Sequence, residues 1–158
     1  MEPDVNVSQV SAPMEAVDSR AHCADRSRRR SDRTGDTRDR ARILVVEHDG
    51  RARDALAVML QEHGYDVTLA SDGREATRLL AQVTPDLVVM NWRTPGLSGF
   101  SLCLALRRRW PMMPIVAVSA IEEVFDGDLP VNAWLRKPVD PPLLSQVIRD
   151  ELAPVWSS

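Results

Sequence analysis

From residue 41 onward, short segments that are either apolar throughout or alternately apolar and polar are followed by longer segments whose apolar residues recur at helical spacing. The predicted strands cover 43–46, 65–69, 86–90, 114–118 and 133–136. The predicted helices cover 51–63, 73–81, 100–109 and 141–152. Strands that alternate with helices form a parallel sheet covered on both faces by right-handed crossovers. We therefore predict an α/β fold, doubly wound around a five-stranded parallel sheet.

The first 40 residues differ sharply from the rest. The stretch 20–40 has two alanines as its only aliphatic residues, too little apolar surface to offset the entropy lost on folding. We predict a disordered, arginine-rich tail over 1–40, a folded domain over 41–153 and a short C-terminal tail over 154–158. An alternative is that the tail binds nucleic acid or an acidic partner. Interleaved aspartates and the lack of aromatic residues disfavour that alternative.

Composition excludes several classes of protein. The formal net charge of −3 implies no strong general attraction to nucleic acid or membranes. The apolar runs are far too short to span a bilayer, and the N-terminus lacks the pattern of a signal peptide. The two cysteines, Cys23 and Cys103, do not suggest a disulfide framework. We therefore expect a cytoplasmic protein without a membrane segment.

The carboxyl ends of parallel strands meet along one edge of a sheet, and ligands of open α/β folds bind there. In this chain the edge is expected to gather Glu47, His48, Asn91, Ser119 and Lys137, which are far apart in the sequence. This convergence marks the candidate site. Asn91 is its unusual member, because it follows the apolar strand 86–90 with an amide, a group of low reactivity.

Several linked motifs resemble those of one family. They are ILVVEH at 43–48, an A-x-x-G-x-x-A turn at 70–76, NWRTPGLSG at 91–99, VSA at 118–120 and RKP at 136–138. In this order they resemble the receiver domain of two-component response regulators, the CheY-like family with a flavodoxin-like fold. The resemblance covers about residues 42–152.

The resemblance implies functional positions at the sheet edge. In that family Mg²⁺ sits on an acidic pair, and an aspartate after the third strand takes a phosphoryl group from a histidine kinase. A Ser or Thr and a Lys bind the phosphoryl oxygens, and an aromatic residue reorients. The matching positions here are Asn91 for the phosphoacceptor, Glu47 and His48 for the acidic pair, Ser119, Trp134 and Lys137 for the phosphate and switch residues, and Pro95 and Pro138 for the loop and cis-proline positions.

Two of these positions depart from the family pattern. Asn91 replaces the phosphoacceptor, and a neutral amide does not give a stable phosphoryl adduct. His48 replaces the second acid, and imidazole is a poor ligand for Mg²⁺. With His48 neutral, the charges of Glu47 and Lys137 cancel, so the site needs no cation. We therefore predict a pseudo-receiver without cofactor or enzymatic activity. Its expected partner is a signalling protein, either a histidine kinase or a downstream effector, or a second copy in a homodimer.

Other interpretations remain open. The chain could be a working phosphorelay receiver with another acceptor, or with Mg²⁺ held by Glu47 and Asp49. A phosphotransferase or hydrolase is disfavoured, because the sequence lacks a nucleophile–base pair and a Gly-rich phosphate loop. Individual residues also have simpler interpretations. His48 could be an exposed loop residue or a ligand of a soft metal, Ser119 a strand-end cap, and Trp134 a static aromatic residue.

Two further features are expected outside the site. The segment 121–133 contains Gly127 and Pro130 and shows little helical period, which predicts a shortened fourth helix. In the family that helix belongs to the usual partner and dimer face. Trp92 is expected to be half-buried, and the arginines at 107–109 are expected to form a solvated helix end.

Overall fold

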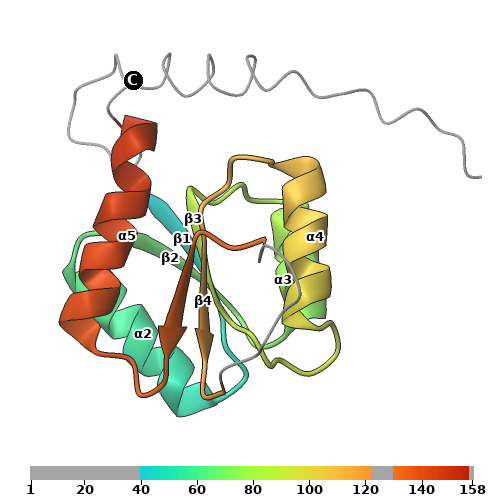
Figure 1. Cartoon of the computed structure of the whole chain (residues 1–158), viewed down its shortest axis with the longest axis horizontal. Helices are drawn as coiled ribbons and strands as arrows, with labels where there is room; N and C mark the ends of the chain where they lie inside the picture. Colours follow the sequence, from blue (N-terminus) through green and yellow to red (C-terminus); the bar gives the residue numbers. More distant parts are fainter. Residues whose placement is uncertain (1–39, 122–129, 157–158) are drawn as a thin grey trace, which may run out of the picture. The chain divides into compact units, whose positions relative to one another are not determined.

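The structure of the protein is a computed structural model, which describes residues 40–121 and 130–156 (Figure 1). The strands are β1 (Arg42–Val46), β2 (Asp66–Ala70), β3 (Leu87–Asn91), β4 (Ile115–Ser119) and β5 (Ala133–Arg136). The described helices are α2 (Gly50–Glu62), α3 (Gly73–Leu80), α4 (Gly99–Arg109) and α5 (Pro141–Trp156). The five strands form one parallel sheet in the order β2-β1-β3-β4-β5. The predicted doubly wound α/β fold is confirmed.

Helices cover both faces of the sheet (Figure 1). Successive residues of a strand point to opposite faces, so β1 contributes to two cores. Leu44 and Val46 pack on the side of α3 and α4, whereas Ile43 and Val45 pack on the side of α2 and α5. This double burial explains why the central strands are nearly continuous apolar runs.

Side-chain caps start three of the helices close to the carboxyl ends of the strands. Asp49 Oδ1 accepts a hydrogen bond from the backbone N–H of Ala52 at the start of α2, at 2.8 Å. Asp72 caps α3 and Ser98 caps α4 in the same way. Such caps satisfy N–H groups that the first helical turn leaves without partners. The loops at the functional edge therefore have fixed entry points into their helices.

Three strands begin and end one residue later than the apolar pattern predicted. The predicted strands 65–69, 86–90 and 114–118 are observed at 66–70, 87–91 and 115–119. Asn91 pairs with Val118, and Ser119 pairs with Arg136. Because backbone pairing does not require an apolar side chain, the hydrophobic run ends before the strand does. Asn91 and Ser119 are consequently held by the sheet itself rather than by a loop.

The C-terminal helix is longer than predicted. It continues to Trp156 and contains Pro154, whereas we predicted a tail from residue 154. A proline in the last turn removes only one helical hydrogen bond, so it does not end the helix there. Most of the predicted N-terminal tail (residues 1–39) and of the predicted short fourth helix (residues 122–129) lies outside the described residues. No helix in the described part of the chain is both long and apolar enough to cross a bilayer.

The prediction that the arginines at the end of α4 are solvated was wrong for Arg107, which is partly buried and hydrogen-bonded. Its guanidinium group donates hydrogen bonds to the carbonyl oxygens of Met113 and Pro130 and, at 2.6 Å, to Oδ1 of Asn132. Asn132 Oδ1 also accepts from the N–H of Ile115 at 2.9 Å. Arg107 thus ties the end of α4 to the segment that enters β5. Its neighbours at 108 and 109 are exposed, as predicted.

Candidate functional site

Glu47, the residue after β1, lies at the centre of the polar contacts at the sheet edge. Its side chain is only 2% exposed. Oε2 accepts a hydrogen bond from Lys137 Nζ at 2.8 Å. Oε1 accepts from Asn91 Nδ2 and from the backbone N–H of Asp49, each at 3.0 Å. Both carboxylate oxygens are therefore engaged by donors of the protein.

The contacts of Glu47 decide its protonation state. Burial raises the pKa of this carboxyl, but hydrogen bonds from Lys137, Asn91 and the Asp49 N–H outweigh burial and hold the pKa below its ordinary value of 4.5. At neutral pH the side chain is a carboxylate. The charge is balanced locally by the ammonium group of Lys137.

A pKa that is lower in the folded than in the unfolded chain makes stability depend on pH. The ionised Glu47 stabilises the fold above its ordinary pKa of 4.5, and this contribution is lost as the pH falls from there through the lowered pKa. We expect the wild type to lose more of its free energy of unfolding over this acid range than Glu47→Gln does. Urea unfolding at a series of pH values measures the difference. Parallel pH profiles of the two proteins would contradict the assignment.

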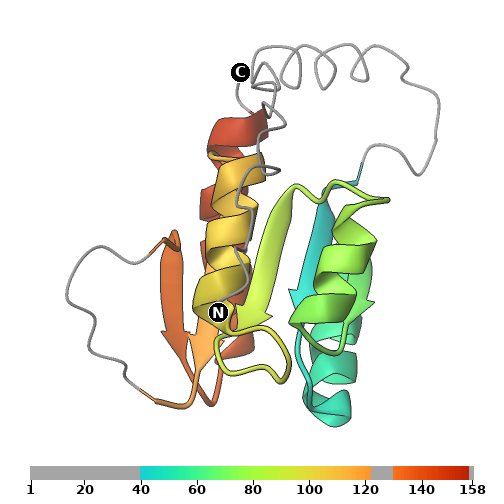
Figure 2. The same ribbon diagram turned by 90° about the vertical axis from the view of Figure 1, so that its right-hand side faces the viewer.

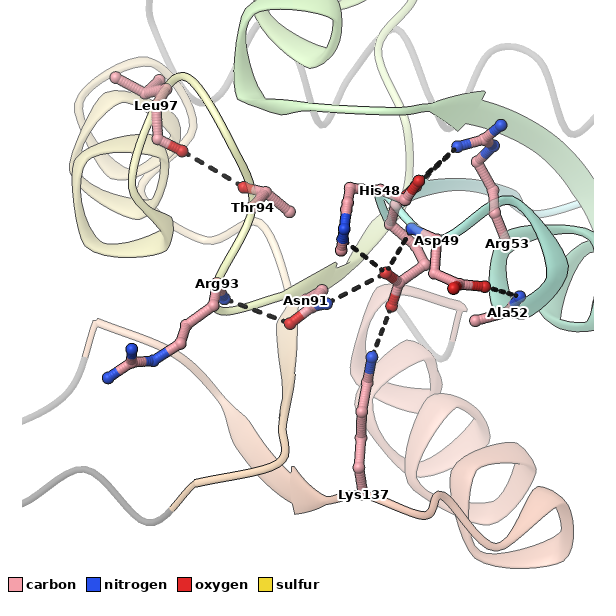
Figure 3. Close-up of polar contacts among 10 residues, drawn as sticks. His48, Asp49, Ala52, Arg53, Asn91, Arg93, Thr94, Leu97 and Lys137 are labelled. Atoms are coloured by element: carbon pink, nitrogen blue, oxygen red, sulfur yellow. Dashed lines mark hydrogen bonds and ion pairs between the residues drawn. The ribbon is translucent and has the colours of Figure 1, made fainter.

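Asn91 uses both ends of its side-chain amide. Nδ2 donates to Glu47, and Oδ1 accepts from the backbone N–H of Arg93 at 3.2 Å (Figure 3). A carboxylate at this position would offer no donor to Glu47 and would place a second negative charge beside it. Asparagine is thus the residue type that fits this network without an added cation.

Lys137 reaches the site from the end of β5. It is the only lysine of the chain, which otherwise uses arginine as its basic residue. Its backbone N–H donates to the carbonyl oxygen of Ser119 at 2.8 Å, and its bond to Pro138 is the one cis peptide bond among the described residues. The side chain is 29% exposed, so the ammonium group lies at the rim while its partner Glu47 is buried.

The two residues after Glu47 contribute no second carboxylate to the site. His48 is 55% exposed, and its Nδ1 lies 3.6 Å from Glu47 Oε1. The Asp49 carboxylate is turned to the first turn of α2, where it accepts from Ala52. Arg53 fixes this loop by donating to the carbonyl oxygen of Glu47 at 2.9 Å. The structure therefore places the acid of Asp49 in a helix cap rather than at the sheet edge.

Ser119 and Trp134 are the remaining predicted phosphate and switch residues, and each contacts other parts of the domain. Ser119 is buried, and its Oγ accepts from the backbone N–H of Ile121 at 3.2 Å, as a strand-end cap does. Trp134 packs edge-on against Trp92, with 5.1 Å between ring centroids. Trp92 is 4% exposed, so the prediction of a half-buried residue was wrong. It is buried because a second aromatic ring, Phe100, also packs on it at 6.5 Å.

A groove beside the site was not predicted from the sequence. It has a volume of about 440 Å³ and is lined by His48 and by residues around the β3–α4 loop, among them Trp92, Pro95 and Phe100. Apart from His48, its walls come from the segment 92–100, and the hollow depends on how that loop folds, which its sequence does not specify. The aromatic residues on either side of the TPG turn are the only local sequence signal.

The parallel order of the sheet, with an acid, an amide, a serine and a lysine at the carboxyl ends of its strands, defines a receiver-type domain. The profile of the response regulator receiver domain matches residues 43–149, more than half of the chain. The chain belongs to this family.

Comparisons with individual proteins agree with this assignment. The response regulator MprA of Mycolicibacterium vanbaalenii is 39% identical over 101 residues, which are 61% of this chain and 44% of that protein. The alkaline phosphatase synthesis transcriptional regulatory protein PhoP of Bacillus subtilis is 36% identical over 104 residues, 63% of this chain and 43% of that protein. The chain thus matches less than half the length of these relatives.

Solved structures show the same architecture. The response regulator TrrA of Thermotoga maritima, solved in complex with Mg²⁺ and BeF, superimposes with a TM-score of 0.65 at 27% identity. That match covers 71% of this chain and 99% of that one. A CheY-like receiver domain from Methanospirillum hungatei has a TM-score of 0.70 at 23% identity and covers 74% of this chain and 97% of that one.

The residues present here do not fit the Mg²⁺ ion that the family implies. Magnesium requires several oxygen ligands in a small octahedron. Among the described residues, Glu47 is the carboxylate in the network at the sheet edge, and both of its oxygens are already hydrogen-bonded. Among the described residues, no group of three or more His, Cys, Asp or Glu side chains could hold a metal ion. The donor set therefore disagrees with the family's usual metal site.

Proposed function

We propose that this chain is a receiver domain that takes up no phosphoryl group and that signals by binding another protein. The observation that carries the proposal is the closed network of Glu47, Asn91 and Lys137. In this network the amide, the carboxylate and the ammonium group satisfy one another. The site is neutral without metal or phosphate, and no side chain in it is poised to attack phosphorus.

The chemistry of the three side chains supports this function. An acyl phosphate forms when a carboxylate oxygen attacks phosphorus, and Asn91 offers a neutral amide instead. Besides a carboxylate nucleophile, phosphoryl uptake requires a cation that screens the charge of the incoming phosphoryl group. Lys137 is already paired with Glu47, at 2.8 Å. The usual attraction of a receiver site for Mg²⁺ and phosphate is therefore removed at both the nucleophile and the metal position.

Partners are inferred from the family and its named members. Receiver domains are generally signalling rather than enzymatic domains, and the relatives above are a response regulator and a transcriptional regulatory protein. For this chain we propose a histidine kinase or a downstream effector as the partner, bound without phosphoryl transfer. The chain itself is proposed to have no enzymatic activity.

Titration with MgCl₂ in a calorimeter tests the metal part of the proposal. We expect wild type to show no saturable heat in the millimolar range, because both Glu47 oxygens are already hydrogen-bonded and His48 and Asn91 supply no carboxylate. The double variant His48→Asp/Asn91→Asp restores two carboxylates and is expected to bind Mg²⁺. Saturable binding to wild type would contradict the proposal and would favour a working receiver.

A further inference from the structure

The outward face of α4 exposes apolar side chains in an ordered line. Phe100 is 43% exposed and Leu104, one turn later, is 37% exposed. Arg108 follows after another turn and is exposed as well. Residues four apart lie above one another on a helix, so these three side chains form one strip along α4. Figure 2 shows α4 and α3 on the side of the sheet that faces the viewer.

The Phe100 end of the strip adjoins the groove described above. Phe100 also lines the groove of about 440 Å³ beside the β3–α4 loop. Trp92, which forms part of the groove wall, packs against Phe100 and is itself buried. The apolar strip of α4 and the groove are therefore one continuous surface, with room for an incoming side chain at its N-terminal end.

Among the residues that the structure describes, the fully exposed charged side chains around this surface have one sign. The exposed charged residues of α3, the β3–α4 loop and α4 are all arginines: Arg74, Arg78, Arg93, Arg108 and Arg109. The carboxylates of this region are Asp72, Glu75 and Asp86, and each is only partly exposed. The Glu75 side chain is 34% exposed and lies 3.5 Å from Arg78. Glu75 accepts from the N–H and hydroxyl of Ser71, and Asp86 accepts from the N–H of Arg42.

Two further observations define this surface as a basic one beside the groove. Arg74 approaches the loop, because a Cβ on Gly96 would lie 3.6 Å from Arg74 Cγ. The other helical layer is mixed in charge, since α2 and α5 expose Asp54, Glu62 and Asp150 together with Arg51 and Arg149. Among the described residues, the excess of exposed arginine is thus a property of the α3–α4 face and not of the α2–α5 face.

We propose that the strip Phe100–Leu104–Arg108 and the adjoining groove dock an acidic amphipathic helix of a partner protein. The apolar face of that helix packs on Phe100 and Leu104 and places one side chain in the groove. Its carboxylates face the surrounding arginines, which favours association and selects against basic partners. This inference rests on the proposed function only in that a domain acting by contact needs a docking surface.

Other anionic partners fit this face less well. Nucleic acid is bound mainly through phosphate contacts to basic side chains, and these make no use of a central apolar line. An anionic membrane offers a broad surface to an amphipathic helix, but α4 buries its apolar side in the core and its exposed strip ends in a concave groove. A helix in a groove accounts for both the apolar and the basic residues.

A display experiment tests the proposal on the full chain. A yeast-displayed library of short helices has apolar residues at i, i+3, i+4 and i+7 and freely varied residues elsewhere, and is sorted for binding of the labelled protein. We expect the selected helices to be enriched in Asp and Glu and to bind Leu104→Glu and Arg108→Glu at least tenfold more weakly. Val58→Glu is the matched control, because Val58 is an exposed apolar residue of α2 (54%) outside the strip. Thermal unfolding confirms that the variants fold.

Three outcomes of the helix selection would overturn the proposal. They are no enrichment, enrichment without an acidic excess, and binders that tolerate Leu104→Glu. A DNA duplex and vesicles containing phosphatidylserine are tested in parallel. Binding of either one in an Arg108-dependent way, tighter than the selected helices, would also overturn it. Phosphoryl uptake by wild type would refute the proposed function and leave helix binding unaffected, so the two failures are distinguishable.

Discussion

Replacing Lys137 by methionine is expected to lower the free energy of unfolding by about 3 kcal/mol, because it leaves the buried carboxylate of Glu47 without its paired cation. Breaking a buried ion pair from one side costs more than the pair contributes, since the remaining charge keeps its desolvation penalty. Glu47 is 2% exposed, and the hydrogen bonds from Asn91 and Asp49 remain. The 29% exposure of Lys137 places the expected cost at the lower end of the usual range.

The double variant Glu47→Gln/Lys137→Met is the control for this prediction. Glutamine keeps an oxygen that can accept from Asn91 and from the Asp49 N–H but carries no charge. Its stability is expected to lie within about 1 kcal/mol of wild type. Chemical denaturation of the three proteins gives both numbers. A single variant as stable as the double one would show that the Glu47–Lys137 pair does not form.

Gly99→Ala is expected to destabilise the fold by roughly 2–3 kcal/mol through overpacking against the backbone. A Cβ at Gly99 would lie 2.5 Å from the carbonyl oxygen of Trp92 and 3.0 Å from its Cα. Neither atom is the end of a flexible side chain, so the β3–α4 loop or α4 must shift. The measurement is the midpoint of urea unfolding at constant m-value.

Gly50→Ala is the matched control for this substitution. Gly50 is also the first residue of a helix, but its Cβ would meet only the end of the Arg53 side chain, at 3.9 Å. Alanine is the better helix former, so the variant is expected to be as stable as wild type or slightly more stable. Equal losses in the two variants would show that the clash at Trp92 is absent.

The fold could be predicted because the pattern of apolar residues repeats along the chain. The residues of each strand or helix were sufficient to predict that element, and the alternation of strands with helices implied a parallel sheet. The predicted ends of strands and helices were wrong where backbone hydrogen bonding, and not the polarity of the side chain, determines where the element ends. Asn91 and Ser119 belong to their strands because the sheet pairs them, although their side chains are polar. Pro154 lies within α5 for a similar reason, since one lost hydrogen bond does not end a helix.

The candidate site could be predicted only as a set of neighbours. Parallel strands bring Glu47, Asn91 and Lys137 to one edge, and the structure shows that they hydrogen-bond to one another. The sequence does not specify that Asp49 caps α2, because the same residue is within reach of the edge and of the helix. The groove was missed for a related reason. It depends on how Trp92 and Phe100 pack, which no spacing rule specifies.

Intact mass after incubation with a small phosphodonor and Mg²⁺ tests most directly whether the Asn91 site takes a phosphoryl group. The double variant His48→Asp/Asn91→Asp serves as the positive control, since it restores both the nucleophile and the acidic pair. We expect wild type to gain no phosphoryl mass while the double variant does. A gain by wild type that maps to residues 43–149 would contradict the account and would make this chain a phosphorylated receiver with a different acceptor.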